Sequence, residues 1–145
     1  MTQPAIRPAL AADRAAIVAL LDAAQLPTAD LEQSPIEFLV ADDADALVGV
    51  VGIERHGDSG LLRSLVVQPA MKGSGLGTQL VRALEARARA AGVVRLVLLT
   101  QTAAPFFARL GYATIDRDDA PSAVRDSAEF RSIRPASATC MAVAL

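Results

Sequence analysis

The sequence has no tryptophan, one tyrosine, four phenylalanines and one cysteine among its 145 residues. With so few aromatic residues, a hydrophobic core must be built mainly from leucine, valine and isoleucine. A single cysteine excludes an internal disulfide and a metal site made of several thiolates. No apolar run reaches the roughly 18 residues of a membrane span, and the N-terminus lacks the basic and apolar regions of a signal peptide. We therefore expect a cytoplasmic protein without a membrane partner or a bound metal.

An excess of basic charge is also absent. The formal net charge is -2, and charged residues make up 21% of the chain. Because a basic surface is the usual footprint of nucleic-acid binding, we expect no nucleic-acid partner. The length suits one domain, and no linker, repeat or low-complexity tract divides it. We therefore expect residues 1–145 to form a single domain.

What the sequence does contain is a glycine-rich loop between a strand and a helix. Leu61–Val67 is a short run rich in leucine and valine. The loop, Lys72 to Thr78, follows it and reads KGSGLGT. Leu76, Leu80, Leu84 and Ala88 then recur at every fourth position, as on one face of a helix. The N–H groups of such a loop, together with a helix N-terminus, form a favourable site for a phosphate.

The spacing of the glycines distinguishes between the known types of phosphate-binding loop. A P-loop requires lysine and then serine or threonine after its last glycine, but here Lys72 precedes the glycines. A dinucleotide loop requires G-x-G-x-x-G and an acidic residue after the next strand. The loop here is G-x-G-x-G, and the next strand ends at Thr100 without an acid. Lys72–Gly77 instead resembles the pyrophosphate loop of a family of acyl-CoA-binding enzymes, and a plain glycine turn is the alternative.

The rest of the chain alternates between short strand and helix patterns. Asp42-Asp43-Ala44-Asp45 predicts a hairpin turn, because like charges disfavour a strand. The patterns predict an α/β (α+β) fold with one mixed, mostly antiparallel sheet of about seven strands flanked by about four helices. We expect strands at 5–8, 37–41, 46–56, 61–67, 93–100, 112–115 and 138–143, and helices at 13–24, 26–33, 75–91 and 103–110, with a helical turn at 122–126.

This order of elements, with the glycine loop after the fourth strand and Phe106–Tyr112 after the fifth, resembles the GNAT superfamily of N-acetyltransferases. The resemblance covers essentially the whole chain, from Ala5 to Val143. Within the superfamily the chain is most similar to the small arsenic-resistance N-acetyltransferases, and it also resembles the catalytic domains of amino-acid acetyltransferases that act on glutamate. The segments that carry the resemblance, besides the loop, are Val51–Glu54, Leu61–Leu65, Leu98–Thr100, Phe106-Phe107, Leu110–Tyr112, Phe130–Ser132 and Pro135–Ala138.

The resemblance implies acetyl-CoA as co-substrate, held in a gap where the fourth and fifth strands splay apart. The pyrophosphate would bind the loop, and the pantetheine arm and acetyl carbonyl would bind the backbone of the fourth strand. Core packing is the alternative for the two phenylalanines. The implied cofactor-binding residues are Leu65, Val66, Val67, Lys72, Gly73, Ser74, Gly75, Leu76, Gly77, Thr78, Thr100, Phe106 and Phe107.

Acetyl transfer to an amine also needs a proton acceptor for the amine and a proton donor for the leaving thiolate. Many members of the superfamily have a tyrosine where Phe107 stands, and phenylalanine cannot donate a proton. Tyr112 is near in sequence, but we expect it to pack. Glu54 and His56, at the end of the third strand, are the candidate catalytic bases, since an imidazole ordinarily titrates near neutral pH. A solvated strand end is the alternative for both.

The candidate substrate-binding residues are Arg63, Ser64 and Arg131, with Arg134 as a further cation. Alternation along a strand places Arg63 and Ser64 on opposite faces. A buried arginine needs an anionic partner, which is either a structural acid or a substrate carboxylate. Cys140 alone cannot chelate arsenic, and we expect it to be a core residue rather than a nucleophile.

Together these features predict an N-acetyltransferase that moves an acetyl group from acetyl-CoA to a small amine by direct attack in a ternary complex. The expected acceptor bears an anionic group, as in an amino acid or an amino-acid-like organoarsenical. A protein lysine or N-terminal acetyltransferase and a non-catalytic acyl-CoA sensor are the alternatives. We expect a monomer or a homodimer.

Overall fold

The computed structural model describes residues 4–44, 46–133 and 137–145, and its strands form one sheet. The spatial order is β1-β2-β3-β4-β5-β7-β6, so the last strand lies between β5 and β6. All neighbouring strands are antiparallel except β4 and β5, which confirms the mixed, mostly antiparallel sheet. The strands are β1 (Ala5–Pro8), β2 (Ile36–Asp43), β3 (Ala46–His56), β4 (Ser59–Val67), β5 (Arg95–Thr100), β6 (Ala113–Ile115) and β7 (Thr139–Ala144).

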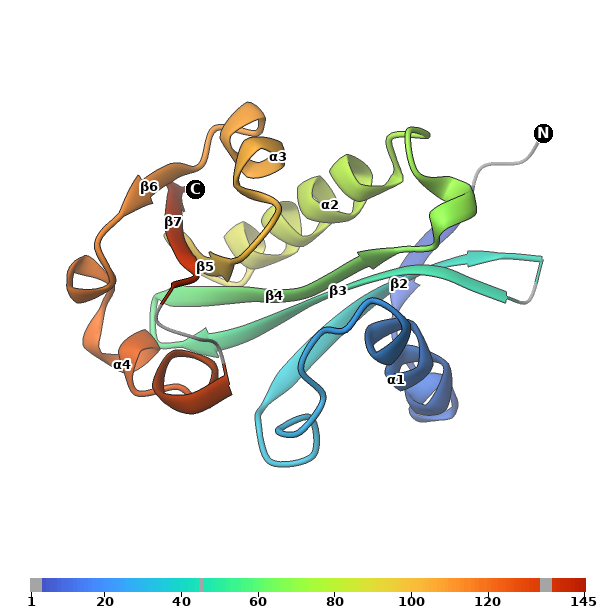
Figure 1. Cartoon of the computed structure of the whole chain (residues 1–145), viewed down its shortest axis with the longest axis horizontal. Helices are drawn as coiled ribbons and strands as arrows, with labels where there is room; N and C mark the ends of the chain where they lie inside the picture. Colours follow the sequence, from blue (N-terminus) through green and yellow to red (C-terminus); the bar gives the residue numbers. More distant parts are fainter. Residues whose placement is uncertain (1–3, 45, 134–136) are drawn as a thin grey trace.

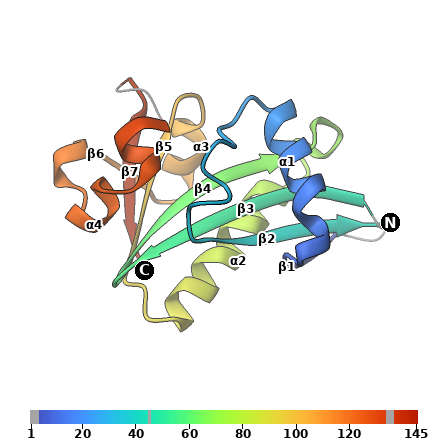
Figure 2. The same ribbon diagram turned by 90° about the horizontal axis from the view of Figure 1, so that it is seen from below.

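Helices cover both faces of the sheet (Figures 1 and 2). One face carries α2 (Leu76–Ala90) and α3 (Ala104–Arg109). The other carries α1 (Arg14–Ala23) at one end and α4 (Ser122–Arg125) with the π-helix η4 (Glu129–Ile133) at the other. Short 3-10 turns complete the chain at η1 (Ala11–Asp13), η2 (Pro69–Met71) and η3 (Arg117–Asp119).

The two faces have different cores. On the α2 face, the predicted stripe of Leu76, Leu80, Leu84 and Ala88 is at most 4% exposed and packs on the sheet in one continuous cluster. The opposite face has two separate apolar clusters, one under α1 and one under α4 and η4. As a result, the middle of that face is left to polar side chains, which form part of the candidate site.

One local expectation is wrong and another is right with different bounds. Residues 26–33 form no helix but a series of turns, held by the Ser34 N–H to Asp30 carbonyl bond of 2.8 Å. Pro27 lies near the start of this segment and Pro35 follows it, and proline interrupts a helix. The expected hairpin is present, since β2 and β3 pair antiparallel as far as Asp43 and Ala46, but Asp42 and Asp43 belong to β2. Arg7 of β1 compensates Asp42 through an ion pair of 3.2 Å. Asp45 lies outside the described residues.

The sheet opens where β4 and β5 meet, as expected. The two strands pair only through Ser59, Gly60 and Leu61 with Arg95, Leu96 and Val97. Beyond these residues no further pair joins them, while β5 remains paired with β7 to Thr100. The second half of β4 and the second half of β5 therefore form the two walls of a gap, which leads toward the glycine loop.

Candidate active site

The glycine loop presents free backbone donors to open space. Gly73 and Gly75 have φ of 83° and 85°, and a Cβ on either would meet no atom within 4 Å. Glycine is therefore needed there for the left-handed backbone, with room left in front of it. Gly77 differs, because its added Cβ would lie 3.4 Å from Phe106 Cζ, and it allows α2 to approach α3. Among the described residues, no acceptor is found for the N–H groups of Gly73, Gly75, Gly77 and Thr78.

A cavity of about 680 Å³ lies in front of these donors. Its walls come from the loop, from the end of β4, and from the start of α3. Lys72 and Arg109 at its edge are exposed cations, which suits a phosphate-bearing ligand. Of the loop residues, Ser74 does not line it, because its hydroxyl donates back to the Met71 carbonyl at 2.5 Å. The expected cofactor residues that do line it are Leu65, Val66, Val67, Lys72, Gly73, Gly75, Leu76, Gly77, Thr78 and Phe106.

The gap between β4 and β5 holds a second cavity, of about 230 Å³. It adjoins the loop cavity, because five residues line both: Ala24, Leu26, Leu65, Thr102 and Ala103. Thr100 and Phe107 line it, as expected, but both also have structural contacts. Thr100 Oγ1 accepts the Ala103 N–H at 2.9 Å, in the turn that leads into α3. Phe107 is 4% exposed and makes edge contacts with Phe106 and Tyr112.

A β-bulge in β4 faces this gap. Gly52 pairs with Arg63 and Val50 with Val66, so Ser64 and Leu65 together oppose Val51. Ser64 has φ of 61°, a left-handed conformation that costs a non-glycine residue about 1 kcal/mol or more. The bulge breaks the alternation of side chains. The expectation that Arg63 and Ser64 lie on opposite faces is therefore wrong, and Arg63 Nε donates to Ser64 Oγ at 3.1 Å.

Arg63 is the centre of a buried group that we call the arginine cluster: Arg63, Asp30, Glu54 and Glu129. The guanidinium donates to both oxygens of Asp30 at 2.5 and 2.8 Å and to Glu54 Oε2 at 2.8 Å. Glu129 Oε1 lies 4.0 Å from its Nε. The arginine side chain has no exposed surface. Of the two partners that the sequence left open, the structure therefore provides structural acids. Arg63 and Ser64 both line the gap cavity.

Hydrogen bonds and charges within the cluster stabilise the ionised forms of Arg63 and Asp30. Burial alone would lower the pKa of Arg63, but the hydrogen bonds from its guanidinium to Asp30 and Glu54 and the nearby Glu129 charge raise it. Burial alone would raise the pKa of Asp30, but hydrogen bonds from Arg63 and Ser34 hold it below its ordinary value. Three carboxyl groups thus surround one guanidinium.

The two candidate bases contact each other but not the gap. His56 Nε2 lies 3.1 Å from Glu54 Oε1, and Glu54 also accepts the bond from Arg63. Neither residue lines the loop cavity or the gap cavity. His56 pairs opposite Ser59, where β4 and β5 are still joined. That position is five residues from Ser64, or roughly 16 Å along the strand. Their placement therefore favours a structural role over direct proton transfer.

The remaining candidates fall outside the gap. Tyr112 is buried on the α2 face and donates its hydroxyl to Glu85 Oε2 at 2.8 Å. Burial and this bond raise the pKa of Tyr112. Burial also raises the pKa of the Cys140 thiol to about 11, so the thiol stays protonated near neutral pH. Arg131 is exposed on η4, and Arg134 lies outside the described residues.

Sequence reasoning missed Asp30, Glu129 and Glu85, the acids that hold Arg63 and Tyr112. A buried arginine signals that acids lie nearby, but its spacing does not say which ones. In the part of the chain that the structure describes, no group of three or more metal-ligating side chains is placed to hold an ion. No helix there is long and apolar enough to cross a membrane.

Comparison with known proteins identifies the family. Residues 34–114 match the model of the acetyltransferase (GNAT) domain, and the chain belongs to that family. It is 31% identical over 93 residues to an amino-acid acetyltransferase of Ralstonia nicotianae, covering 63% of this chain and 21% of that protein. It is 36% identical over 72 residues to an IAA acetyltransferase of Azospirillum brasilense, covering 48% of this chain and 47% of that protein. The chain thus spans less than half the length of either relative.

Solved structures confirm the fold. N-acetylglutamate synthase from Neisseria gonorrhoeae, complexed with coenzyme A and N-acetyl-glutamate, superposes with a TM-score of 0.84 at 23% identity, covering 100% of this chain and 36% of that one. Rv2747 from Mycobacterium tuberculosis, in complex with CoA and a ligand named NLQ, superposes with a TM-score of 0.79 at 27% identity. That match covers 98% of this chain and 99% of the other.

Proposed function

We propose that this domain transfers an acetyl group from acetyl-CoA to the amine of a small molecule that bears an anionic group, such as an amino acid. The observation that carries the proposal is that the cavity in front of the unpaired N–H groups of the glycine loop adjoins the cavity between β4 and β5. At one end, backbone N–H groups can donate hydrogen bonds to a pyrophosphate. Along the gap, the free strand edges can pair with an extended arm that contains amides. The relative named an amino-acid acetyltransferase supports this acceptor class, and the neighbour at 27% identity, solved with CoA, supports the donor.

The residues of the gap suggest how the transfer proceeds. The backbone of the β4 bulge, at Ser64 and Leu65, is the group placed to polarise the acetyl carbonyl, since an oxyanion needs fixed N–H donors. The arginine cluster keeps that bulge in its left-handed conformation. Glu54 then acts through Arg63 as a positioning residue. The amine attacks the thioester carbonyl, the C–S bond breaks to release the CoA thiolate, and the proton of the amine reaches that thiolate through water. Water takes this role because neither carboxylates nor imidazole line the gap cavity among the described residues.

For the acceptor, we infer that Arg131 is the cation that recognises its anionic group, because Arg63 is fully engaged by protein carboxylates. An amino-acid-like organoarsenical fits the same description as an amino acid, and it belongs in the same substrate panel. We infer that the reaction takes place in the cytoplasm, in a monomer or a homodimer.

A second candidate is an acyl-CoA-binding protein without turnover. One observation favours it: Phe107 stands at the gap, and the hydroxyl of Tyr112 is committed to Glu85 on the α2 face. No phenol is therefore placed to protonate a thiolate. A sensor needs only the loop and the gap, both of which are present.

A thiol-release assay separates the two candidates. Acetyl-CoA is incubated with amino acids, phosphinic and arsonic analogues, simple amines without an acid group, and lysine peptides. We expect release of free CoA that depends on a carboxylate-bearing amine, with a KM that rises in Arg131→Ala. Tight CoA binding with no amine-dependent release from any member of the panel would favour the sensor. Release with peptides alone would identify a protein acetyltransferase.

A further inference from the structure

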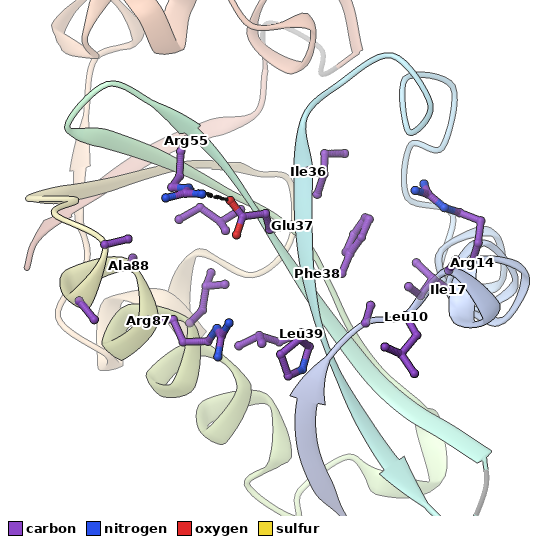
Figure 3. A pocket seen from close by; sticks show the side chains of 17 residues that line it. Leu10, Arg14, Ile17, Ile36, Glu37, Phe38, Leu39, Arg55, Arg87 and Ala88 are labelled. Atoms are coloured by element: carbon purple, nitrogen blue, oxygen red, sulfur yellow. Dashed lines mark hydrogen bonds and ion pairs between the residues drawn. The ribbon is translucent and has the colours of Figure 1, made fainter.

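A cavity of about 700 Å³ lies at the edge of the sheet beside β2, at the end of α2 opposite the glycine loop (Figure 3). None of its lining residues lines the loop cavity or the gap cavity. Arg87, on its α2 side, is eleven residues from Leu76, which is roughly 16 Å along a helix axis. We call it the edge groove. It is separate from the acyl-CoA path.

The groove exists because β1 is shorter than β2. β1 pairs with β2 only from Leu39 to Asp42, and its last residue there is Pro8. Ile36 and Glu37 pair with β3 on their inner side but with no strand on their outer side. After Pro8 the chain turns away into η1 and α1, and the open edge lies between these elements and the last turns of α2.

The walls of the groove are apolar. Leu39 of β2, Ile53 of β3 and Leu84 and Ala88 of α2 line it on the α2 face of the sheet, and Phe38 and Ile17 line it on the α1 face, all at most 8% exposed. The first four belong to the main core cluster, so this side is continuous with the rigid packing of the α2 face. Leu10 at the margin is 66% exposed, although large apolar side chains are normally buried. Such a surface favours a ligand with an apolar body.

The rim of the groove is cationic. Arg14, Arg55 and Arg87 line it together with a single acid, Glu37. Glu37 pairs with Arg55 at 2.6 Å, and the other two arginines have no carboxylate partner in the ranges 4–44, 46–133 and 137–145. Figure 3 shows Arg87 directed from α2 toward Leu39. Three guanidinium groups and one carboxylate leave two net positive charges here, in a chain of net charge -2.

We propose that the edge groove is a second ligand site, which binds a small carboxylic acid with an apolar body, such as an aryl- or branched alkyl-substituted acetate. The apolar wall takes the body, and Arg87 donates to the carboxylate. The volume lies within the roughly 300–1,000 Å³ of small-molecule pockets. A guanidinium fork matches a carboxylate in geometry as well as in charge. The open edge of two residues is too short for a partner strand, since strands average about five or six residues.

Amide-resolved NMR of the whole protein, recorded with saturating CoA, tests the proposal. Phenylacetate is the probe. Phenylacetamide keeps the apolar body without the charge, and acetate keeps the charge without the body. We expect phenylacetate to shift the amide signals of residues 36–39 and 87–91, with the loop signals already fixed by CoA. Both control ligands should bind about tenfold more weakly or worse.

Matched variants locate the carboxylate. Arg87→Gln should weaken phenylacetate about tenfold. Arg89→Gln, an equal change at an exposed arginine that does not line the groove, should leave the affinity unchanged. Equal effects of the two variants, or equal binding of phenylacetamide, would overturn the proposal. The proposal would also be overturned if the amide signals of residues 36–39 shifted with protein concentration rather than with ligand. Such shifts would mean that a second copy of the chain binds the open edge of β2. CoA shifts at residues 72–78 report separately on the proposed function.

Discussion

Asp30 and Arg63 are 33 positions apart in the sequence and are joined by two hydrogen bonds of 2.5 and 2.8 Å. Asp30 belongs to the segment between α1 and β2, which also contributes Gln25 and Leu26 to the gap cavity. Arg63 directly precedes the left-handed Ser64 and bonds to its hydroxyl. This one ion pair therefore fixes the segment and the bulge, two parts of the gap wall, with respect to each other.

Asp30→Ala should remove that connection. We expect the free energy of unfolding to fall by about 2–4 kcal/mol, because a buried charge pair loses one member while Glu54 and Glu129 still compensate Arg63. Urea denaturation measures the loss, and kcat should fall while CoA binding at the loop persists. Glu32→Ala, an exposed acid in the same segment, is the control and should lie within about 0.5 kcal/mol of the wild type. Equal losses in the two variants would contradict the role of the pair.

Gly75→Glu should abolish CoA binding. A side chain at Gly75 enters the open space in front of the loop and adds a negative charge beside the pyrophosphate. Gly92→Glu is the matched control, since Gly92 also has a left-handed φ, of 89°, with nothing within 4 Å, but lies beyond the other end of α2. Both variants should lose about 1 kcal/mol or more of stability from backbone strain. Calorimetry with CoA should show binding by Gly92→Glu alone, and binding retained in a folded Gly75→Glu protein would contradict the loop assignment.

His56→Gln should change kcat by no more than about threefold and leave the acidic limb of the pH–rate profile in place. We expect this small effect because the His56 side chain contacts Glu54 and does not line the gap cavity. Steady-state kinetics over a range of pH measures both quantities. A loss of a hundredfold together with disappearance of the acidic limb would restore His56 as the catalytic base that the sequence suggested.

Tyr112→Phe should keep the catalytic rate and reduce stability by about 1–2 kcal/mol, because it removes only the buried hydroxyl that bonds Glu85. Glu85 retains its contact with Arg82 at 2.9 Å, which limits the loss. Thermal unfolding and thiol-release kinetics report the two effects. If Tyr112 protonated the thiolate, the variant would instead lose rate at every pH, with little change in melting temperature.

Burial of the Cys140 thiol predicts that the free energy of unfolding decreases at high pH. The folded pKa is raised from 9.0 to about 11, so the thiol contributes its full stability below pH 9 and loses it as pH rises toward 11. A shift of two pKa units corresponds to about 2–3 kcal/mol. The stability difference between wild type and Cys140→Ala should therefore shrink across this window, as measured by denaturant unfolding at each pH. At neutral pH the variant should keep its activity within about threefold, and complete loss would indicate an acyl-enzyme route.

The sequence predicted most elements because their patterns are local. The bounds of β1 and β3 agree with expectation to the residue, and the buried stripe of α2 follows from its four-residue spacing. The loop glycines were equally readable, since left-handed φ angles require them. The turns at 26–33 were mistaken for a helix because Pro27 was taken to end the first helix and not to prevent a second one.

Long-range relations could not be predicted in the same way. Alternation assigned Arg63 and Ser64 to opposite faces, but the bulge depends on how β4 meets β3, which neither strand reveals alone. The sequence also could not identify the partner of Arg63, because Asp30 comes close to it only in the folded chain. The edge groove could not be predicted from the sequence either, since the groove results from the difference in length between β1 and β2.

The short contact between β4 and β5 divides the sheet into two half-sheets, one of four strands and one of three, joined by three residue pairs. Hydrogen bonding across the middle of the sheet is therefore incomplete in the protein alone. A ligand arm that lies in the gap and bonds to both strands completes it. Such a ligand acts as an additional strand, and the two halves should then unfold as one cooperative unit and exchange their central amide protons more slowly.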